Sequence, residues 1–285
     1  MSLSTVTTIQ ALRDMLKQWR KAGNSVAFVP TMGNLHDGHL QLVKKAKECA
    51  DKVVVSLFVN PTQFGVGEDF NHYPRTESED AKKLDAIGTD LLFLPSVSEI
   101  YSENHRTSVS VSGLSNLHCG KTRVGHFDGV ATIVCKLFNI VQPDLAYFGE
   151  KDFQQLTLIR TLVRDLNIPV EICGIETARE ADGLAMSSRN GYLSAEERLV
   201  APALYRSLCQ ARDSILAGEQ NYPALEKKLI LSLREAGLQP EYFSVCRQSD
   251  LMPAGLDDID LVILAAARLG KTRLIDNVYF SKVLL

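Results

Sequence analysis

The sequence predicts an α/β fold in which a parallel sheet with helices on both faces precedes a smaller α+β domain. Through the first two-thirds of the 285 residues, short apolar runs alternate with helical patterns, as strand–helix–strand units do. The apolar run at 52–59 is β-branched and nearly continuous, which suits a strand covered on both faces. Beyond residue 190 the helices come together and the strands come together, a pattern typical of α+β structure. We therefore expect a Rossmann-like, doubly wound sheet with a second, smaller C-terminal domain.

The elements of the larger domain follow one another in a regular order. The first strand is the apolar run 25–30, and the helix after it, at about 38–50, has Leu40, Val43 and Ala46 at helical spacing. The further expected elements are a strand at 52–59, a helix at 77–87, a strand at 90–95, a helix at 129–141, a strand at 144–148, a helix at about 152–166 and a strand at 170–175. Long polar loops at 60–76 and 113–128 interrupt this order, and such loops are usually functional or mobile.

The smaller domain is expected to contain helices first and strands afterwards. The helices are predicted at 195–217 and 223–236, and short strands near 241–245, 261–265 and 272–275. We expect residues 1–176 to form the larger domain, 177–190 a mobile linker or loop, and 191–285 the smaller domain.

Composition excludes several classes of protein. The net charge of −3, from 31 basic and 34 acidic residues, gives no bulk attraction for nucleic acid. Six scattered cysteines without a C-x-x-C pair are expected to be buried free thiols, which indicates a reducing compartment. The first 19 residues lack the apolar core of a signal peptide, and no stretch reaches the apolar length of a membrane span. We therefore expect a cytoplasmic protein without a membrane or nucleic-acid partner.

The turn after the first strand carries two histidines around a glycine and leads directly into a helix. Ligands of α/β sheets bind at the carboxyl ends of strands, where helix N-termini present free N–H groups. His36 and His39 lie three residues apart, so both can project from one side of the first helical turn and donate to phosphate oxygens, as neutral or cationic imidazoles. Gly38 lets a ligand approach the backbone closely. A zinc site is a weaker interpretation, because His118 and Cys119 match no familiar metal spacing.

Two further segments carry groups suited to a nucleotide. After the strand at 144–148, Lys151 can pair with phosphate, and Asp152 can cap the next helix or accept from ribose hydroxyls. In 177–190, two hydroxyls and a guanidinium follow the apolar Leu184-Ala-Met186, and such a loop can close over a triphosphate. The competing interpretations are an ordinary polar helix cap and a solvated linker.

A fourth segment, Asn60-Pro-Thr-Gln63-Phe64, closes the second strand. Carboxamides at the carboxyl end of a strand can hydrogen-bond a small hydroxy acid. Asn-Pro is also a good turn, and the segment alone does not decide between the two.

Together these segments resemble the pantoate–β-alanine ligase (pantothenate synthetase) family of the His-x-Gly-His adenylyl-transferring superfamily, over essentially the whole chain. The landmarks are PTMGNLHDGHL at 30–40, FVNPTQF at 58–64, GHFDGVATIVCKLFNIVQPDLAYFGEKDFQQ at 125–155 and READGLAMSSRNGYLS at 179–194. His-x-Gly-His alone indicates only the superfamily, whereas the other three are specific to the family. The loop has Ser-Ser-Arg where the wider superfamily carries Lys-Ser, which agrees with this family's pattern.

The resemblance implies a two-step reaction. ATP and pantoate form pantoyl adenylate and pyrophosphate with the assistance of Mg²⁺, and the amine of β-alanine then displaces AMP to give pantothenate. Because a mixed anhydride supplies the leaving group, the enzyme needs mainly to position the reactants and neutralise charge. The resemblance also implies a homodimer, with the substrate sites in the larger domain and the smaller domain as a lid.

The family's functional residues can be carried over position by position. The ATP site would comprise Met32, Gly33, Asn34, Leu35, His36, Asp37, Gly38, His39, Gly149, Glu150, Lys151, Asp152, Ala178 (through its backbone), Met186, Ser187, Ser188 and Arg189. Pantoate would be held by Gln63 and Gln155, with Asn60 beside them. Catalysis would fall to His39 as the acid toward the phosphates, with His36, Lys151, Ser187, Ser188 and Arg189. No side chain is identified as a direct metal ligand.

Two other functions compete with ligation through an acyl adenylate. Nucleotidyl transfer to a phosphate acceptor would need basic residues in the acceptor pocket, where the sequence offers carboxamides such as Gln63 and Gln155. A non-catalytic or RNA-binding relative is disfavoured by the net charge and by the lack of an anticodon-binding extension.

Overall fold

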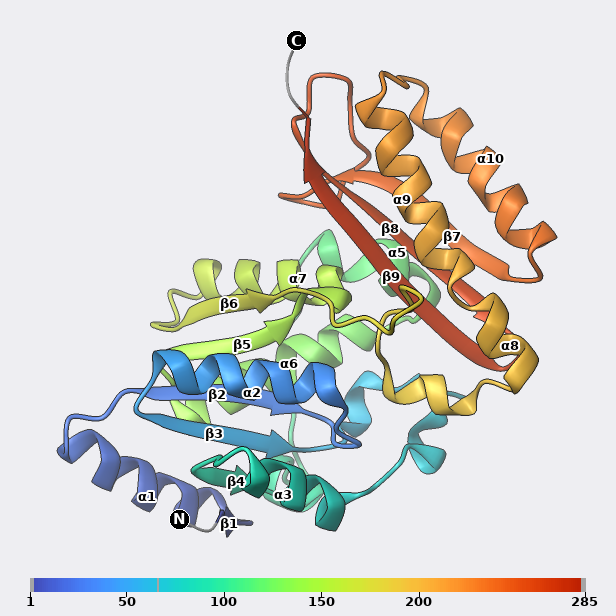
Figure 1. The fold of residues 1–285 in the computed structure, drawn as a ribbon. Coiled ribbons are helices and arrows are strands. Elements are labelled where there is room, and N and C mark those ends of the chain that lie inside the picture. The colour runs from blue at the N-terminus through green and yellow to red at the C-terminus, as the bar shows by residue number, and fades with distance from the viewer. Residues whose placement is uncertain (1–2, 66, 283–285) are drawn as a thin grey trace.

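The computed structural model describes residues 3–65 and 67–282 and contains a parallel sheet of six strands (Figure 1). The strands are β1 (Ser4–Val6), β2 (Val26–Thr31), β3 (Lys52–Leu57), β4 (Leu91–Phe93), β5 (Leu145–Gly149) and β6 (Glu171–Ile175). They lie in the order β1-β4-β3-β2-β5-β6, and every neighbouring pair is parallel. The parallel sheet expected from the alternating pattern is confirmed.

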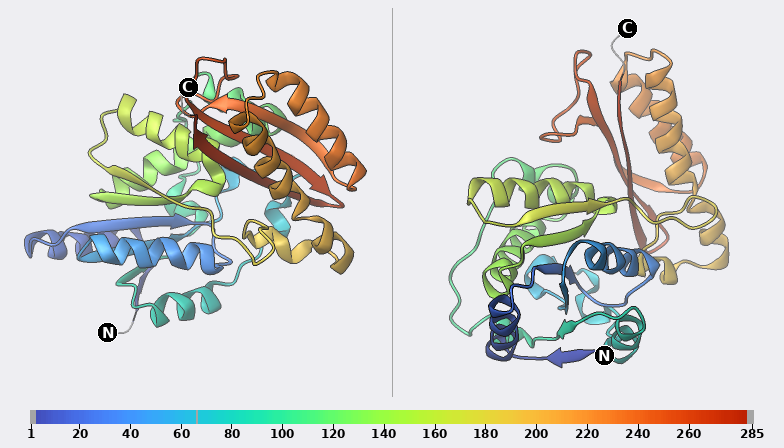
Figure 2. Two further views of the ribbon diagram at one scale, coloured as in Figure 1. Left: turned by 45° about the horizontal axis from the view of Figure 1, so that its top comes forward. Right: turned by 60° about the vertical axis from the view of Figure 1, so that its left-hand side comes forward.

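Helices cover both faces of this sheet (Figure 2). The helices of the larger domain are α1 (Ile9–Lys21), α2 (Asp37–Cys49), α3 (Glu77–Ala86), α4 (Val97–Ile100), α5 (His118–Thr122), α6 (His126–Val141) and α7 (Phe153–Asp165). Successive strand residues point to opposite faces, so Phe28 packs into the core with α1, α6 and α7, while Val29 packs into the core with α2 and α3. Short 3-10 turns lie at Pro61–Gln63, Asp69–His72, Leu114–Asn116, Glu150–Asp152 and Ser188–Tyr192.

The first two elements, β1 and α1, were not expected from the sequence pattern. The strand β1 has only three residues at the edge of the sheet, and two of them are exposed. Although α1 is amphipathic, its only fully buried residues are Leu12 and Leu16. A strand as short as β1 is too short to show a pattern, whereas α1 does carry apolar residues at helical spacing, a signal that was overlooked in the sequence.

The path of the chain through the sheet brings two distant turns together. From the central strand β2 the chain moves outward to β3 and β4, and it then returns to place β5 on the other side of β2. The connections after β2 and β5 therefore diverge, and a crevice opens between them at the carboxyl ends of the strands, which is the usual ligand site of such sheets.

The C-terminal part pairs three helices with a three-stranded antiparallel sheet. Its elements are α8 (Ala195–Val200), α9 (Ala203–Leu216), α10 (Tyr222–Glu235), β7 (Gln239–Arg247), β8 (Asp260–Leu269) and β9 (Thr272–Ser281). The prediction of one helix over 195–217 was wrong, because Pro202 lacks an N–H group and the chain breaks there into α8 and α9. The strands are longer than expected, since a tight turn at 270–271 lets β8 and β9 pair along their full lengths.

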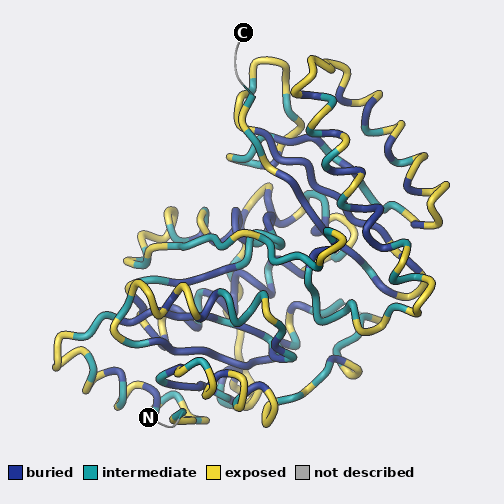
Figure 3. The backbone as a smooth tube through the Cα atoms, viewed as in Figure 1, coloured by how far each residue is buried: buried dark blue, intermediate teal, exposed yellow. Residues whose placement is uncertain are grey.

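In the C-terminal sheet the central strand β8 is buried along most of its length (Figure 3), so both faces of the sheet are covered there. One face packs against α9 and α10, through residues such as Ile263 and Leu208. The opposite face contributes Cys246, Val262 and Leu264 to the core that contains α6 and α7. The two parts of the chain are therefore joined by apolar packing. Within the described residues, no helix combines the length and the apolar character needed to cross a membrane.

Candidate active site

A cavity of about 950 Å³ opens at the carboxyl ends of β2, β3 and β5. Its walls come from both parts of the chain, since Arg268, Lys271 and Arg273 of the β8–β9 hairpin line it together with residues of the larger sheet. The residues it shares with the sequence prediction are Met32, His36, Gly38, His39, Asn60, Gln63, Gly149, Lys151, Asp152, Gln155, Ala178, Met186, Ser187, Ser188 and Arg189.

The turn after β2 is shaped by a carboxylate that the sequence did not single out. Asp80 is completely buried on α3, and its oxygens accept hydrogen bonds from the backbone N–H groups of Asn34 and Leu35, both at 2.8 Å. Gly33 has φ +83° and Asn34 has φ +51°, a backbone shape that these bonds hold in place. Asp80 lies on a predicted helix, where an acidic residue is ordinarily a solvated one, so no sequence signal marked it.

The two histidines adopt a defined arrangement at the start of α2. The N–H of Gly38 donates to Nδ1 of His36 at 3.2 Å, and the N–H of His36 donates to Nδ1 of His39 at 3.4 Å. Their ring centroids are 4.1 Å apart. Because both Nδ1 atoms accept, the Nε2 atom of each neutral ring carries the proton and can donate to a ligand. A Cβ at position 38 would lie 3.0 Å from the His36 ring, which explains the glycine.

Both histidines are neutral in the free protein. Burial, reinforced by the charge of Lys151, lowers the pKa of His36 to about 4. Burial also lowers the pKa of His39 to about 3, with further contributions from His36 and Lys151. Of the two charge states that the sequence left open, the structure therefore favours the neutral imidazole.

The second turn, after β5, faces the first across the crevice. Lys151 and Asp152 line the cavity, and the charge of Lys151 acts on both histidines. Asp152 occupies the N-cap position of α7, as the helix-cap interpretation expected, but within the described residues its carboxylate makes no capping bond, and Asp152 lines the cavity. Around a hypothetical Cβ on Gly149, no atom of the described chain lies within 4 Å, which leaves room for a ligand.

Five residues of the predicted ATP site do not line the cavity. Four of them belong to the turn after β2 and one belongs to the turn after β5. Gly33 and Asn34 shape the first turn, Leu35 is buried in the core with α2, and Asp37 is exposed. Glu150 is turned toward the C-terminal sheet, where its carboxylate accepts a hydrogen bond of 2.9 Å from the Tyr279 hydroxyl.

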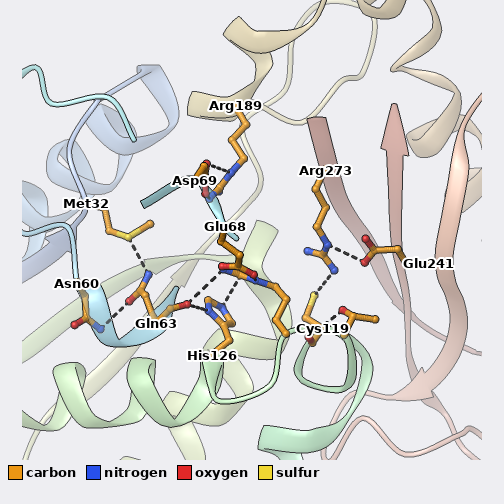
Figure 4. A network of polar contacts seen from close by, with 12 residues as sticks. Met32, Asn60, Gln63, Glu68, Asp69, Cys119, His126, Arg189, Glu241 and Arg273 are labelled. Carbon is orange, nitrogen blue, oxygen red and sulfur yellow. Dashed lines mark hydrogen bonds and ion pairs between the residues drawn. The ribbon is translucent and has the colours of Figure 1, made fainter. Parts of the chain in front are cut away.

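The segment 177–190 folds into a small hairpin over the cavity. Arg179 pairs with Ala185 as an isolated antiparallel bridge, and the N–H of Met186 donates to the carbonyl of Ala178 at 2.9 Å. Beyond this bridge, Arg189 forms a bidentate ion pair with Asp69, both distances being 3.0 Å (Figure 4). The loop that follows β3 and the hairpin are therefore linked across the opening of the cavity.

The opposite end of the cavity presents carboxamides beside an apolar wall. The Nε2 of Gln63 donates to the Met32 sulfur at 2.8 Å, and its Oε1 accepts from Asn60 Nδ2 at 3.2 Å (Figure 4). Asn60 is itself fixed by the Tyr101 hydroxyl, which donates to its Oδ1 at 2.9 Å. The apolar wall is formed by Val130, Ile133, Val134 and Leu137 of α6. A small molecule with one polar and one branched apolar end suits this surface.

An ionic group beside Gln63 was missed by the sequence reasoning. Arg123 donates to both Glu68 oxygens, at 2.7 and 2.6 Å, and to Nε2 of His126 at 2.9 Å. The Nδ1 of His126 in turn donates to the carbonyl of Gln63 at 2.7 Å. Burial alone would raise the pKa of Glu68, but the hydrogen bonds and charge of Arg123 lower it to about 2. Burial and then Arg123 lower the pKa of His126 to about 4. The sequence signal was the length of the two loops, 60–76 with Glu68 and 113–128 with Arg123 and His126.

The additional ligands that a zinc site at His36 and His39 would need lie elsewhere. His118 Nε2 is bonded to the Leu251 carbonyl at 2.9 Å, and the Cys119 sulfur lies 2.9 Å from the Tyr242 hydroxyl, both at the contact with the C-terminal sheet. Neither residue lines the cavity. Across 3–65 and 67–282, no cluster of three or more His, Cys, Asp or Glu side chains could hold a metal.

Comparisons with known proteins agree on one family. A family model described as pantoate-beta-alanine ligase matches residues 4–279. Pantothenate synthetase of Marinobacter nauticus is 52% identical over 98% of this chain and 100% of its own length. That of Pseudomonas fluorescens is 54% identical over 98% of each chain.

Solved structures match in the same way. The pantothenate synthetase of Thermus thermophilus has a TM-score of 0.91 at 45% identity, covering 97% of this chain and 99% of that chain. The pantoate-beta-alanine ligase of Francisella tularensis, complexed with β,γ ATP and β-alanine, has a TM-score of 0.80 at 34% identity, covering 97% of both chains.

Proposed function

The chain belongs to the pantoate–β-alanine ligase family, and from this premise we propose that its cavity divides into an ATP part and a pantoate part. The reaction is the ATP-dependent condensation of pantoate with β-alanine to pantothenate, with release of AMP and pyrophosphate. The proposal concerns which residues of this chain perform each part of that reaction.

The ATP part comprises the two turns at the carboxyl ends of β2 and β5 and the hairpin above them. Two Nε2–H donors, the Lys151 ammonium and the N-terminus of α2 converge here, a combination suited to polyphosphate. Gly149 and Asp152 would contact the ribose, and the backbone of Ala178 would contact the adenine. Ser187, Ser188 and Arg189 would contact the phosphates after Arg189 exchanges Asp69 for a phosphate oxygen.

The pantoate part lies around Gln63 and Gln155, against the apolar wall of α6. Carboxamides can accept from the hydroxyls of pantoate and donate to its carboxylate, while the wall suits its branched carbon skeleton. The observation that carries this assignment is the fixed orientation of the Gln63 carboxamide. It is hydrogen-bonded to Met32, which follows β2, and to Asn60, which follows β3.

In the first step a pantoate carboxylate oxygen attacks the α-phosphorus of ATP, and the bond from that phosphorus to the bridging oxygen breaks. The pyrophosphate that leaves carries the electron pair of this bond. His39 donates its Nε2–H toward the departing oxygens, and His36, Lys151 and Arg189 stabilise their charge. A bound polyphosphate would also raise the pKa of both histidines, because the imidazolium form gains an opposite charge.

In the second step the amine of β-alanine attacks the acyl carbon of pantoyl adenylate. The acyl–oxygen bond breaks, AMP leaves with the electron pair, and the nitrogen releases its proton to solvent. No covalent protein nucleophile is required, so catalysis rests on positioning and charge stabilisation.

We propose that Mg²⁺ accompanies ATP rather than occupying a protein cage. The carboxylates that line the cavity include Asp152 and Glu176, and the other two, Glu68 and Asp69, are paired with arginines. One or two carboxylates with phosphate oxygens and waters form a typical Mg²⁺ set, and Asp152 fits that role. When bound, the cation would neutralise phosphate charge.

The family resemblance also motivates three proposals about the whole molecule. We infer a homodimer, which sedimentation equilibrium would test. All six thiols are free, but only Cys119 and Cys246 are buried and Cys49 is exposed, so the expectation of buried thiols was wrong for the other four. Free thiols still support a reducing compartment such as the cytoplasm. We place the domain boundaries at 1–176, 177–190 and 191–285, which limited proteolysis would test at the hairpin.

The direct test is AMP formation from ATP and pantoate that depends on β-alanine, with other acids and amines as controls. Gln63→Ala should raise the KM for pantoate far more than that for ATP, and equal losses would mean that the pantoate part is misplaced. His39→Ala should lower adenylate formation by roughly two to four orders of magnitude. Pyrophosphate release at the wild-type rate by a folded His39→Ala variant would remove the acid assignment.

A further inference from the structure

A residue of the C-terminal sheet hydrogen-bonds the backbone of the turn after β5, the turn that we assign to ATP. Asn277 lies on β9 and is 4% exposed. Its Nδ2 donates to the carbonyl of Glu150 at 2.8 Å and to the carbonyl of Lys151 at 2.9 Å. Both hydrogens of one amide are therefore used on two consecutive peptide groups of the turn.

These two bonds fix the direction of the N–H groups on the same peptides. In a trans peptide the C=O and N–H point in opposite directions. With the carbonyls of Glu150 and Lys151 turned toward Asn277, the N–H groups of Lys151 and Asp152 point away from β9. They belong to the turn that opens α7, where free N–H groups are best placed to bind an anion.

The residue beside Asn277 holds the second ATP-facing segment. The Asp276 carboxylate accepts a bidentate pair from Arg179, at 2.7 and 3.0 Å, and Arg179 directly follows Ala178. Arg179 also donates to the Asn277 carbonyl at 3.3 Å. Adjacent strand residues point to opposite sides, so one short piece of β9 reaches two separate segments of the cavity wall.

We propose that Asn277 is a positioning residue for ATP, acting through the Glu150–Lys151 peptides to aim the Lys151 side chain and the N–H groups of the turn at the phosphates. The inference rests on the proposed assignment of Lys151 to the ATP site. It makes β9 a part of the ATP-binding machinery through a residue, Asn277, that does not itself line the cavity.

The test compares two carboxamides with the same bonding pattern. Asn277→Leu removes both donors at similar volume. The matched control is Gln248→Leu, because Gln248 Nε2 also donates to two backbone carbonyls, those of Leu261 and Phe280, but within the C-terminal part. Asn277→Ser is a second variant, whose smaller polar side chain is easier to accommodate but too short to reach the carbonyls.

Initial rates of pantoate-dependent pyrophosphate release are measured while ATP and pantoate are varied separately. Displacing a binding group by about 1 Å costs up to about a hundredfold in rate, so we expect kcat/KM for ATP to fall by about tenfold to a hundredfold in either Asn277 variant. The KM for pantoate should stay within about twofold, and Gln248→Leu should leave both substrates at wild-type values.

A double-mutant cycle with Lys151→Ala separates positioning from a general structural role. Because Asn277 would act partly through the Lys151 side chain, Asn277→Ser should cost less in the Lys151→Ala background than in wild type; the loss that remains would come from the N–H groups of the turn, which alanine keeps. Additive losses, or equal losses for ATP and pantoate, would overturn the inference. Should Lys151→Ala alone leave the KM for ATP unchanged, the proposed ATP site itself fails. Should it raise that KM while both Asn277 variants behave as wild type, only the positioning inference fails.

Discussion

Gly129 offers the sharpest test of where pantoate binds. In the first turn of α6, a Cβ at this position would lie 2.6 Å from the Thr62 carbonyl carbon and 2.7 Å from Gln63 Cα, with the Thr62 oxygen closer still. Gly129 also accepts, through its carbonyl, a hydrogen bond of 3.2 Å from Asn60 Nδ2. The helix thus touches the backbone of the carboxamide segment with no side chain between them.

The size of the effect of Gly129→Ala follows from this contact. To extend the 2.6 Å contact with the Thr62 carbonyl carbon to an ordinary 3.4 Å, the backbone at 62–63 must move by at least about 0.8 Å, and the closer Thr62 oxygen requires more. Overpacking of this kind costs about 1–3 kcal/mol, and the better helix propensity of alanine offsets about 1 kcal/mol, so the variant should fold with a loss of about 0–2 kcal/mol. The same displacement carries the Gln63 carboxamide with it and should lower kcat/KM for pantoate by about a hundredfold.

The assay is pantoate-dependent pyrophosphate release at saturating ATP, with urea unfolding as the measure of stability. Gly255→Ala is the matched control, because a Cβ there would meet only the Asp258 carboxylate, at an ordinary 3.5 Å. A folded Gly129→Ala variant with kcat/KM for pantoate within about threefold of wild type would refute the placement. An equal fall in kcat/KM for ATP would refute it as well, since only the pantoate end adjoins Gly129.

Three further predictions concern the ATP end. Asp80→Asn should destabilise the protein by about 1.5–3 kcal/mol and raise the KM for ATP, because charge-assisted bonds to two backbone N–H groups are lost. Urea unfolding measures the first effect and an ATP titration the second. An unchanged KM would show that this turn does not contribute to ATP binding. Arg189→Ala should raise the KM for ATP, whereas Asp69→Asn should lower it by about fivefold, because Asp69 competes with phosphate for the Arg189 guanidinium. If steady-state assays show that both variants shift the KM for ATP in the same direction, this competition is excluded. The pKa values of His36 and His39 are lowered from 6.5 to about 4 and about 3, so as the pH falls the unfolded chain binds protons at these residues before the folded protein does. The free energy of unfolding should therefore be unaffected by their protonation above about pH 6.5. It should decrease as the pH falls toward 4, by at most about 1.4 kcal/mol per pH unit for each histidine. Urea unfolding at about pH 7 and pH 5.5 tests this, and a double His→Gln variant that keeps the same pH dependence would assign it to other groups.

The sequence predicted those parts of the fold in which a pattern is repeated over many residues. The strand run 52–59 and the helical spacing after Leu40 are long and strongly apolar, and both elements occur in the structure within a few residues of their expected limits. Where the signal is short it was missed or misjudged. The three-residue strand β1 is one example, and the helix that breaks at Pro202 is another, because apolar residues keep helical spacing across the break.

In the candidate site, too, features contained in a few consecutive residues could be predicted, whereas contacts between residues distant in the sequence could not. The histidine turn and the turn at Lys151 are each contained in a few residues, so motif spacing identifies them. The groups that hold these turns are remote in sequence: Asp80 binds the first across 45 residues, Asn277 binds the second across 126, and Asp69 pairs with Arg189 across 120. Each is one polar side chain on an ordinary helix, strand or loop, and only the folded topology makes its partner known.

The return of the chain from β4 to β5 explains why both histidines are neutral in the free protein. It sets Lys151 beside two buried histidines, and positive charge with burial keeps both rings neutral. The free crevice therefore holds Nε2–H donors without the cost of burying imidazolium ions. A polyphosphate entering between the turns would bring the opposite charge, reverse the effect of Lys151 on the rings and raise their pKa values. On this reasoning, His39 takes up a proton from solvent, and so becomes an imidazolium able to act as an acid, only while phosphate charge lies beside it. The topology of the sheet thereby links the acid to its substrate.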